Sequence, residues 1–349
     1  MLEKNKRNPY ECFLEKRNTF SNDIIFIDGL WGTGKSLLGP IISGMNGVEK
    51  VKVESIYEYV SWLFHLGKID LDGGLWMLKT YADTSQYHNL IGREINLRWS
   101  DDTGLGNSLN KLGLIRRLFG NEGDSKVKEI NEKNLALTVM SHMLILAPEL
   151  LVNAYGERVK VIEVVRHPLY MFEHYASYLE RFDSSREFTM SYYIGSNKIP
   201  WFVKDWADEY LCVNLLERSV LSIARTYSWL FDNIEKLKRE NVQILELSFE
   251  EIIFETEKVL VKLENFTNRN HSRSIKTILK KQRLPRISIS AGRGHASYGW
   301  KIDKSPEQDV YRRLLNKVHK SCSKEIFEEF MKLIATYNLK YPSLLSSYE

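Results

Sequence analysis

Short apolar runs alternate with amphipathic stretches along most of the chain. Five of the runs are rich in β-branched residues, which favours buried strands. They span Ile24–Asp28, Val51–Glu54, Leu135–Ser141, Val159–Val165 and Val242–Leu247. The stretches between them place apolar residues at helical spacing. The helices that they predict span Lys35–Met45, Ser55–Leu66, Leu144–Tyr155, Pro168–Arg181, Leu215–Glu240 and Phe249–Asn265. Strands that alternate with helices pair in parallel, so the pattern predicts an α/β fold with a doubly wound sheet of about five strands.

Two regions interrupt this alternation. Residues 67–130 combine many glycines with polar clusters, and they predict a largely helical insertion with loops after the second strand. Residues 183–214 are rich in aromatic side chains and predict a segment that covers a pocket. The chain has 349 residues and shows no internal repeat. We therefore expect a single domain over residues 1–349, with these two regions as insertions.

Composition narrows the classes of protein and partner. Apolar residues make up 43% of the chain, which is enough for a large core. The net charge of +4 is a small difference between 49 basic and 45 acidic residues, so we expect a locally held anion and no nucleic-acid partner. The three cysteines are scattered, which argues against a disulfide framework and a zinc site. No apolar run is long enough to cross a bilayer and the N-terminus lacks a signal-peptide core, so we expect a cytoplasmic protein. The oligomeric state is left open.

The segment Gly29–Ser36 has the form G-x-x-x-x-G-K-S and directly follows a predicted strand. A strand–loop–helix junction of this kind directs backbone N–H groups at one point, where a phosphate binds. Glycines let the chain curl closely around the anion because they have no Cβ. The residues expected to bind phosphate are Gly32, Thr33, Gly34, Lys35 and Ser36. The loop predicts phosphate binding and does not by itself indicate a reaction.

Three further side chains are candidates for the same site. Arg166 directly follows the strand Val159–Val165 and precedes Pro168, which favours the first turn of a helix. Ligands of α/β sheets bind outside the carboxyl ends of the strands, so we expect the Arg166 guanidinium beside the phosphate loop, where it suits a second phosphate. His142 follows another strand end and is a candidate general base. His174 lies on the helix after Arg166 and near the same face.

A basic, glycine-rich loop at residues 293–301 is the fourth informative segment. It begins with Arg293 and Gly294 and ends in Trp300-Lys301. Such a loop is suited to closing over a phosphorylated ligand.

In this order, the four segments resemble the sulfotransferase superfamily that uses 3′-phosphoadenosine 5′-phosphosulfate (PAPS). That family has a phosphate loop, Thr-His at a strand end, Arg-x-Pro after a strand, Tyr-Glu-Asp-Leu, and a C-terminal loop that ends in Trp-Lys. The counterparts here are residues 29–36, Ser141-His142, Arg166-His167-Pro168, Phe249-Glu250-Glu251-Ile252, and residues 293–301.

The resemblance implies transfer of a sulfuryl group from PAPS to a hydroxyl or amine of a small molecule or glycan, with release of 3′-phosphoadenosine 5′-phosphate (PAP). It implies that the phosphate loop binds the 5′ phosphate-sulfate end, and that Arg166 and Arg293, beside Gly294, bind the 3′-phosphate. His174 stands where the family has a serine that contacts this phosphate. His142 is then the general base, and Lys35 stabilises charge on the bridging oxygen. No metal is expected.

Two other classes of function stay open. The phosphate loop is equally typical of a small-molecule kinase or nucleotide hydrolase that uses ATP and Mg²⁺, with Lys35 on the β/γ-phosphates and Ser36 on the metal. A kinase also needs an acidic strand end, for which Glu246 and Glu163 are the candidates. The third class is a non-catalytic nucleotide-binding module. The position of the family's own loop lysine is occupied by Leu30, which fits such a module.

Overall fold

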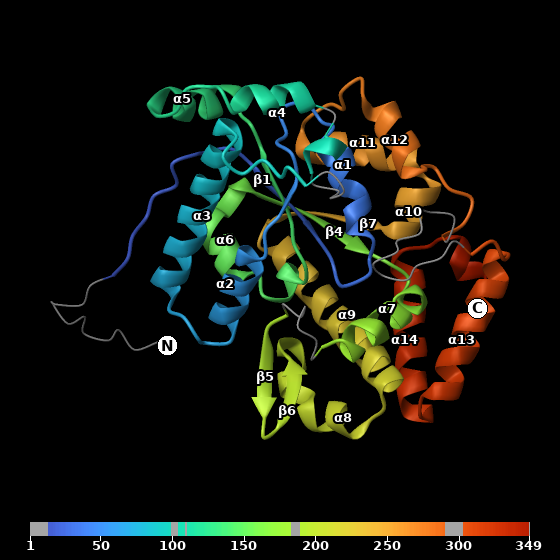
Figure 1. Ribbon diagram of the computed structural model, residues 1–349. Helices are drawn as coiled ribbons and strands as arrows, with labels where there is room; N and C mark the ends of the chain where they lie inside the picture. Colours follow the sequence, from blue (N-terminus) through green and yellow to red (C-terminus); the bar gives the residue numbers. More distant parts are fainter. Residues whose placement is uncertain (1–12, 99–103, 109, 183–188, 290–302, 349) are drawn as a thin grey trace.

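A five-stranded parallel sheet forms the centre of the molecule, in the order β2-β3-β1-β4-β7 (Figure 1). The computed structural model describes residues 13–98, 104–108, 110–182, 189–289 and 303–348. The strands are β1 (Ile24–Asp28), β2 (Lys52–Val53), β3 (Leu137–Met140), β4 (Val159–Val165) and β7 (Gln243–Ser248). Each lies in an apolar run of the sequence, so the predicted α/β fold is confirmed. The phosphate loop leaves the central strand, β1, which has β3 on one side and β4 on the other.

Alternate residues of β1 face two separate apolar cores. Ile24 and Phe26 are buried in one core, and Ile25 and Ile27 are buried in the other. The helices that supply the first core include α2 (Ile56–His65), α3 (Leu71–Ile91), α6 (Glu149–Tyr155) and α9 (Leu215–Arg239). The helices of the second core are α1 (Leu38–Ile42), α10 (Phe249–Phe254), α11 (Thr256–Thr267) and α12 (Ile275–Gln282). Helices therefore cover both faces of the sheet, which confirms the doubly wound arrangement.

The helix behind the phosphate loop is shorter than predicted. The expected helix Lys35–Met45 is a 3-10 turn, Lys35–Leu37, followed by α1, which ends at Ile42. Pro40 lies within α1 and Gly44 just beyond it. Proline and glycine are the weakest helix formers, which accounts for the early end.

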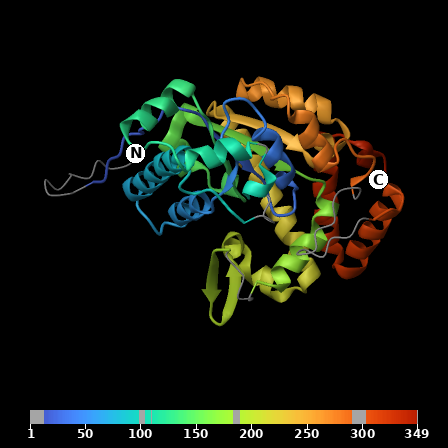
Figure 2. The same ribbon diagram turned by 45° about the horizontal axis from the view of Figure 1, so that its top comes forward.

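The two interrupting regions differ in structure. Residues 67–130 are largely helical, as predicted, with α3, α4 (Lys111–Arg117) and α5 (Asp124–Lys133). The described part of residues 183–214 begins with an antiparallel hairpin of β5 (Ser191–Ile194) and β6 (Asn197–Pro200), which the sequence did not indicate. A 3-10 helix and α8 (Ala207–Cys212) follow. Figure 2 shows the hairpin projecting below the main body of the molecule.

Two C-terminal helices, α13 (Glu307–Ser321) and α14 (Lys324–Lys340), were not among the predicted elements. They pack against α9 and against the 3-10 turn Pro168–Tyr170, which follows β4. The buried residues of α14 include Ile326, Phe330 and Ile334, four positions apart. This helical spacing was the signal available in the sequence. The two helices support the turn that carries Arg166 into the site.

Candidate phosphate-binding site

The phosphate loop closes around the ammonium group of Lys35. Its Nζ donates to the carbonyl oxygens of Gly29 and Leu30, at 3.0 and 3.1 Å. Lys35 is only 5% exposed, and this burial lowers its pKa, while the nearby Asp28 carboxyl opposes the shift. The lysine charge therefore lies at the base of the loop, where it can meet a bound phosphate.

The loop also depends on close contact with two neighbouring helices. Gly32 and Gly34 have φ of +80° and +85°, a region that favours glycine. A Cβ on Gly34 would lie 2.4 Å from the ring of Phe249, and a Cβ on Gly32 would lie 2.9 Å from the ring of His174. Phe249 of α10 and His174 of α7 (Phe172–Glu180) therefore pack directly on the loop.

His174 thus lies beside the phosphate loop, at the site for which the sequence made it a candidate. Burial, with added repulsion from Arg166 and Lys35, lowers the pKa of His174 to about 4. The imidazole is therefore neutral at pH 7. It can still donate one N–H to an anion at the loop.

Arg166 lies on one flank of the loop. Its Nη1 donates to the carbonyl oxygen of Gly32 at 3.0 Å, and its guanidinium carbon lies 4.4 Å from the centroid of the Phe249 ring. Among the described residues, its buried Nε has no hydrogen-bond partner. A buried donor without a partner costs about 1–3 kcal/mol, so an anion that accepts from this group is favoured.

The backbone around Arg166 is held from two sides. The Tyr227 hydroxyl accepts from the Arg166 N–H at 2.9 Å and donates to its carbonyl oxygen at 2.6 Å. The buried Glu250 carboxyl accepts from the N–H of His167 at 3.1 Å and from the hydroxyl of Tyr337, on α14, at 2.7 Å. Glu250 belongs to the Phe249–Ile252 segment of the sequence analysis. It fixes the turn that carries Arg166.

His142 lies at the end of the strand on the other flank, and a glutamate that the sequence analysis missed holds it. Glu58 Oε1 accepts from the His142 N–H at 2.7 Å and lies 3.1 Å from His142 Nδ1. Burial raises the pKa of Glu58 to about 8. The His142 side chain is 37% exposed. Partial removal of the imidazole from water, together with repulsion from Lys35, nevertheless lowers the pKa of His142 to about 3. Both groups are therefore mainly neutral at pH 7. The sequence offered one signal for Glu58, because it is an acidic residue among the apolar positions of the predicted helix Ser55–Leu66.

Of the two carboxylates proposed for a kinase, Glu246 is not at the loop. Glu246 lies within β7, opposite Glu163 of β4, and β4 separates it from β1. It forms ion pairs with Lys238, at 2.5 Å, and with Lys340, at 3.1 Å. Because β7 is the outermost strand on this side of the sheet, these contacts hold Glu246 at the edge of the sheet. The nomination of Glu246 as a metal ligand beside the loop is therefore wrong.

The strand ends beside β1 carry other groups. β3 is followed by Ser141 and His142, and β4 is followed by Arg166. The carboxyl of Asp28, at the end of β1, accepts from the Ser141 hydroxyl and the Ile145 N–H, both at 2.9 Å. Within the described ranges, no group of three or more His, Cys, Asp or Glu side chains could hold a metal ion.

Trp31 and Trp201 belong to the core. Trp31, within the loop, is 5% exposed and packs on Tyr178 with ring centroids 4.1 Å apart. Trp201 is 1% exposed and stacks on Trp62. These tryptophans position the loop and the hairpin rather than offer a ring to a ligand. Arg293 and Gly294 lie outside the described residues.

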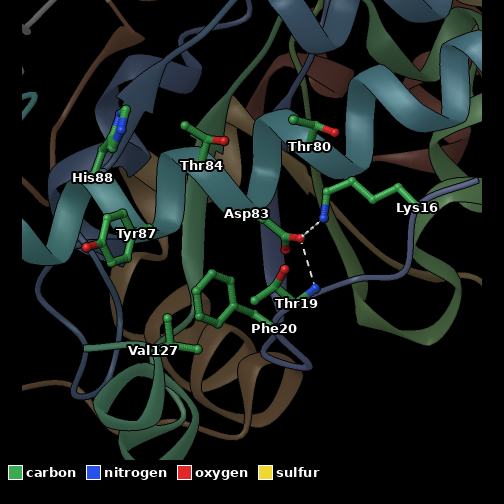
Figure 3. Close-up of a pocket in the computed structure, with 9 residues that line it drawn as sticks. All are labelled: Lys16, Thr19, Phe20, Thr80, Asp83, Thr84, Tyr87, His88 and Val127. Carbon is green, nitrogen blue, oxygen red and sulfur yellow. Dashed lines mark hydrogen bonds and ion pairs between the residues drawn. The ribbon is translucent and has the colours of Figure 1, made fainter. Parts of the chain in front are cut away.

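A separate pocket of about 370 Å³ lies between the N-terminal segment, α3 and α5 (Figure 3). Asp83 accepts there from the ammonium group of Lys16 and, at 2.8 Å, from the N–H of Thr19. These contacts fasten the N-terminal segment to α3. None of the residues that line this pocket belongs to the phosphate loop or its flanks.

No family model matches the chain, and no match was found among curated proteins. Among solved structures, it is similar to the sulfotransferase domain from the curacin biosynthetic pathway, at 13% identity and a TM-score of 0.41, covering 85% of this chain and 98% of that chain. The values are 15% and 0.42 for the sulfotransferase domain from the Synechococcus PCC 7002 olefin synthase, covering 94% of this chain and 98% of that chain. A sulfotransferase from Alicyclobacillus acidocaldarius matches at 12% identity and a TM-score of 0.36, covering 93% of this chain and 98% of that chain.

Proposed function

We propose that this protein is a sulfotransferase that moves a sulfuryl group from PAPS to an acceptor hydroxyl or amine. The observation that carries the proposal is the nature of the two strand ends beside the phosphate loop. They present an imidazole, His142, and a guanidinium, Arg166, whereas a Mg²⁺-dependent kinase uses a carboxylate at a strand end. The carboxyl at the end of β1, Asp28, accepts hydrogen bonds from the Ser141 hydroxyl and the Ile145 N–H. The buried Nε of Arg166, which has no hydrogen-bond partner in the part of the chain that the structure describes, favours a second anionic group beside the loop.

The residues divide into donor-binding and proton-accepting groups. The backbone of residues 32–36 and Lys35 bind the 5′ phosphate-sulfate end. Arg166 and His174, with Arg293 and Gly294 of the C-terminal loop, bind the 3′-phosphate. The bound donor supplies the sulfuryl group, and PAP is the leaving group. Lys35 stabilises the charge that develops on the bridging oxygen as the sulfur–oxygen bond breaks.

His142 accepts the proton of the acceptor group while the acceptor atom bonds to sulfur. Glu58 favours the tautomer in which His142 Nδ1–H donates to Oε1, so the lone pair of Nε2 is available for the acceptor proton. The lowered pKa keeps the imidazole neutral before the reaction. Glu58 is therefore a positioning residue, and His142 is the base.

The partners follow from this reading. We expect a small-molecule or glycan acceptor, no metal requirement, no nucleic-acid partner and a cytoplasmic location. Of the helices that the structure describes, none has the length and apolarity to span a membrane.

Calorimetry of PAP and ADP, each with and without Mg²⁺, tests the proposal. We expect PAP to bind more tightly than ADP, without a requirement for Mg²⁺, because Arg166 offers a site for a 3′-phosphate. Equal affinities, or ADP binding that depends on Mg²⁺, would favour the kinase instead.

A further inference from the structure

The helix α12 and the segments on either side of it carry many basic side chains and no acidic ones. Residues 265–289, all of which the structure describes, contain neither aspartate nor glutamate. In the whole chain, by contrast, 49 basic residues are nearly balanced by 45 acidic ones. The basic residues of this range are Arg269, Arg273, Lys276, Lys280, Lys281, Arg283 and Arg286. Their positive charge is therefore not cancelled by neighbours in the sequence.

Four of these cations follow one side of α12, and we call them the basic row: Arg273, Lys276, Lys280 and Arg283. Two of them lie within α12, one precedes it and one follows it directly, at a spacing of three or four residues that repeats once per helical turn. All four residues are exposed, whereas Ile278 and Leu279 on the other side of the helix are buried. Among the described residues, the four side chains have no hydrogen-bond or ion-pair partner. The row therefore presents its charges to the solvent.

The helix that carries the basic row is fixed to the body of the protein. Ile278 packs so closely on Gly44 that a Cβ on this glycine would lie 2.4 Å from it. The Ser272 N–H donates to the carbonyl oxygen of Gly44 at 2.9 Å, before α12, and the Arg286 N–H donates to that of Ile253 at 2.8 Å, after α12. Figure 1 shows α12 at the outer edge of the molecule. The row is thus held on a firmly attached helix at the surface.

The chemistry of this surface distinguishes between possible anionic partners. A small anion needs converging donors, but a spacing of about 5 Å per helical turn spreads these charges along a convex face. Single-stranded nucleic acids bind through aromatic side chains on which the bases stack, and Phe266, the one Phe, Tyr or Trp residue of residues 265–289, packs against the core. Ile287, four residues after the row, is 94% exposed. An aliphatic side chain beside a row of cations suits the boundary between lipid head groups and acyl chains.

We propose that the basic row of α12 docks the protein on a membrane surface that contains anionic lipids. The phosphate groups of the lipid heads are the chemical partner of the four cations, and Ile287 enters the layer beneath them. Clusters of four or more Lys and Arg residues on an amphipathic helix are typical of such peripheral binding. This inference does not depend on the proposed function, since it concerns a surface outside the phosphate loop and its flanks.

Co-sedimentation with vesicles tests the proposal. We expect the wild type to bind vesicles of phosphatidylcholine mixed with the anionic lipid phosphatidylglycerol, and not vesicles of phosphatidylcholine alone. Binding should weaken as salt rises from about 0.1 M to about 1 M, because the Debye length falls from about 10 Å to about 3 Å. The double variant Lys276→Gln/Lys280→Gln should bind the anionic vesicles roughly 10- to 30-fold more weakly. Glutamine favours helices about as well as lysine, so α12 should stay folded, and thermal unfolding checks this.

The matched control is Lys320→Gln/Lys324→Gln, which removes the same charge from exposed positions near the turn between α13 and α14. Its affinity for the anionic vesicles should stay within about twofold of wild type. Equal weakening in the two double variants would show that net charge matters and not the row, which overturns the proposal. Wild-type affinity in Lys276→Gln/Lys280→Gln, or failure of the wild type to bind anionic vesicles, overturns it as well. Binding of the wild type to polyuridylic acid but to no vesicle would assign the row to a nucleic acid instead.

Discussion

Replacement of the buried Glu58 by glutamine should change how stability depends on pH. In the folded protein, burial raises the pKa of this carboxyl from 4.5 to about 8. Between these values the folded state holds a proton that the unfolded state releases, so this group lowers the free energy of unfolding as pH rises. Glutamine is close to the protonated carboxyl in shape and does not titrate. It also retains an oxygen that can accept from the His142 N–H.

The size of the effect follows from the shift in pKa. Each unit corresponds to about 1.4 kcal/mol, so the full shift is worth roughly 5 kcal/mol above pH 8, as an upper bound. From pH 5 to pH 8, the stability of Glu58→Gln relative to wild type should rise by roughly 4 kcal/mol. Other buried carboxyls, such as Asp28 and Glu163, are present in both proteins, so the difference between the two curves reports on residue 58.

Urea unfolding followed by tryptophan fluorescence, at several pH values from 5 to 9, measures this difference. Glu132→Gln is the control, because it makes the same change on the exposed surface of α5. Its stability should follow the wild-type curve. Parallel curves for wild type and Glu58→Gln would refute the inference that Glu58 is held protonated in the fold.

Two further predictions concern the site. His142→Ala should reduce sulfuryl transfer by about 10²- to 10⁴-fold while PAP binds nearly as in wild type, because the imidazole acts on the acceptor. Steady-state rates measure the transfer and calorimetry measures PAP binding. Retained turnover would show that His142 is not the base. Gly34→Ala should lower the free energy of unfolding by about 2–4 kcal/mol, since its Cβ would lie 2.4 Å from Phe249 at a φ of +85°. Gly67→Ala is the control for backbone strain alone, because Gly67 has a φ of +65° with nothing within 4 Å. A loss of about 1–2 kcal/mol is expected there, and equal losses in unfolding experiments would show that the Phe249 contact does not matter.

Much of the sheet could be predicted because its signals are local. The strands β1 and β4 begin and end where the apolar runs do, because strands buried on both faces are mainly apolar, although β4 also buries Lys160 and Glu163. The phosphate loop, His142 and Arg166 each follow a predicted strand, so the sequence also predicted that all three lie at the carboxyl ends of parallel strands. The helix after the loop was predicted too long, because its apolar spacing is helical up to Met45 whereas Pro40 and Gly44 weaken the segment.

The sequence by itself determined the α/β architecture, the phosphate loop and the side chains that follow the strands. Only the tertiary structure decided which groups act on them. Glu58 meets His142 across 84 positions of sequence, and the ring of Phe249 packs against Arg166. The tertiary structure also shows that Trp31 is buried and that Glu246 lies away from the site. Periodicity reports which face of an element is apolar, whereas these pairings depend on how complete elements pack, and no local pattern encodes that.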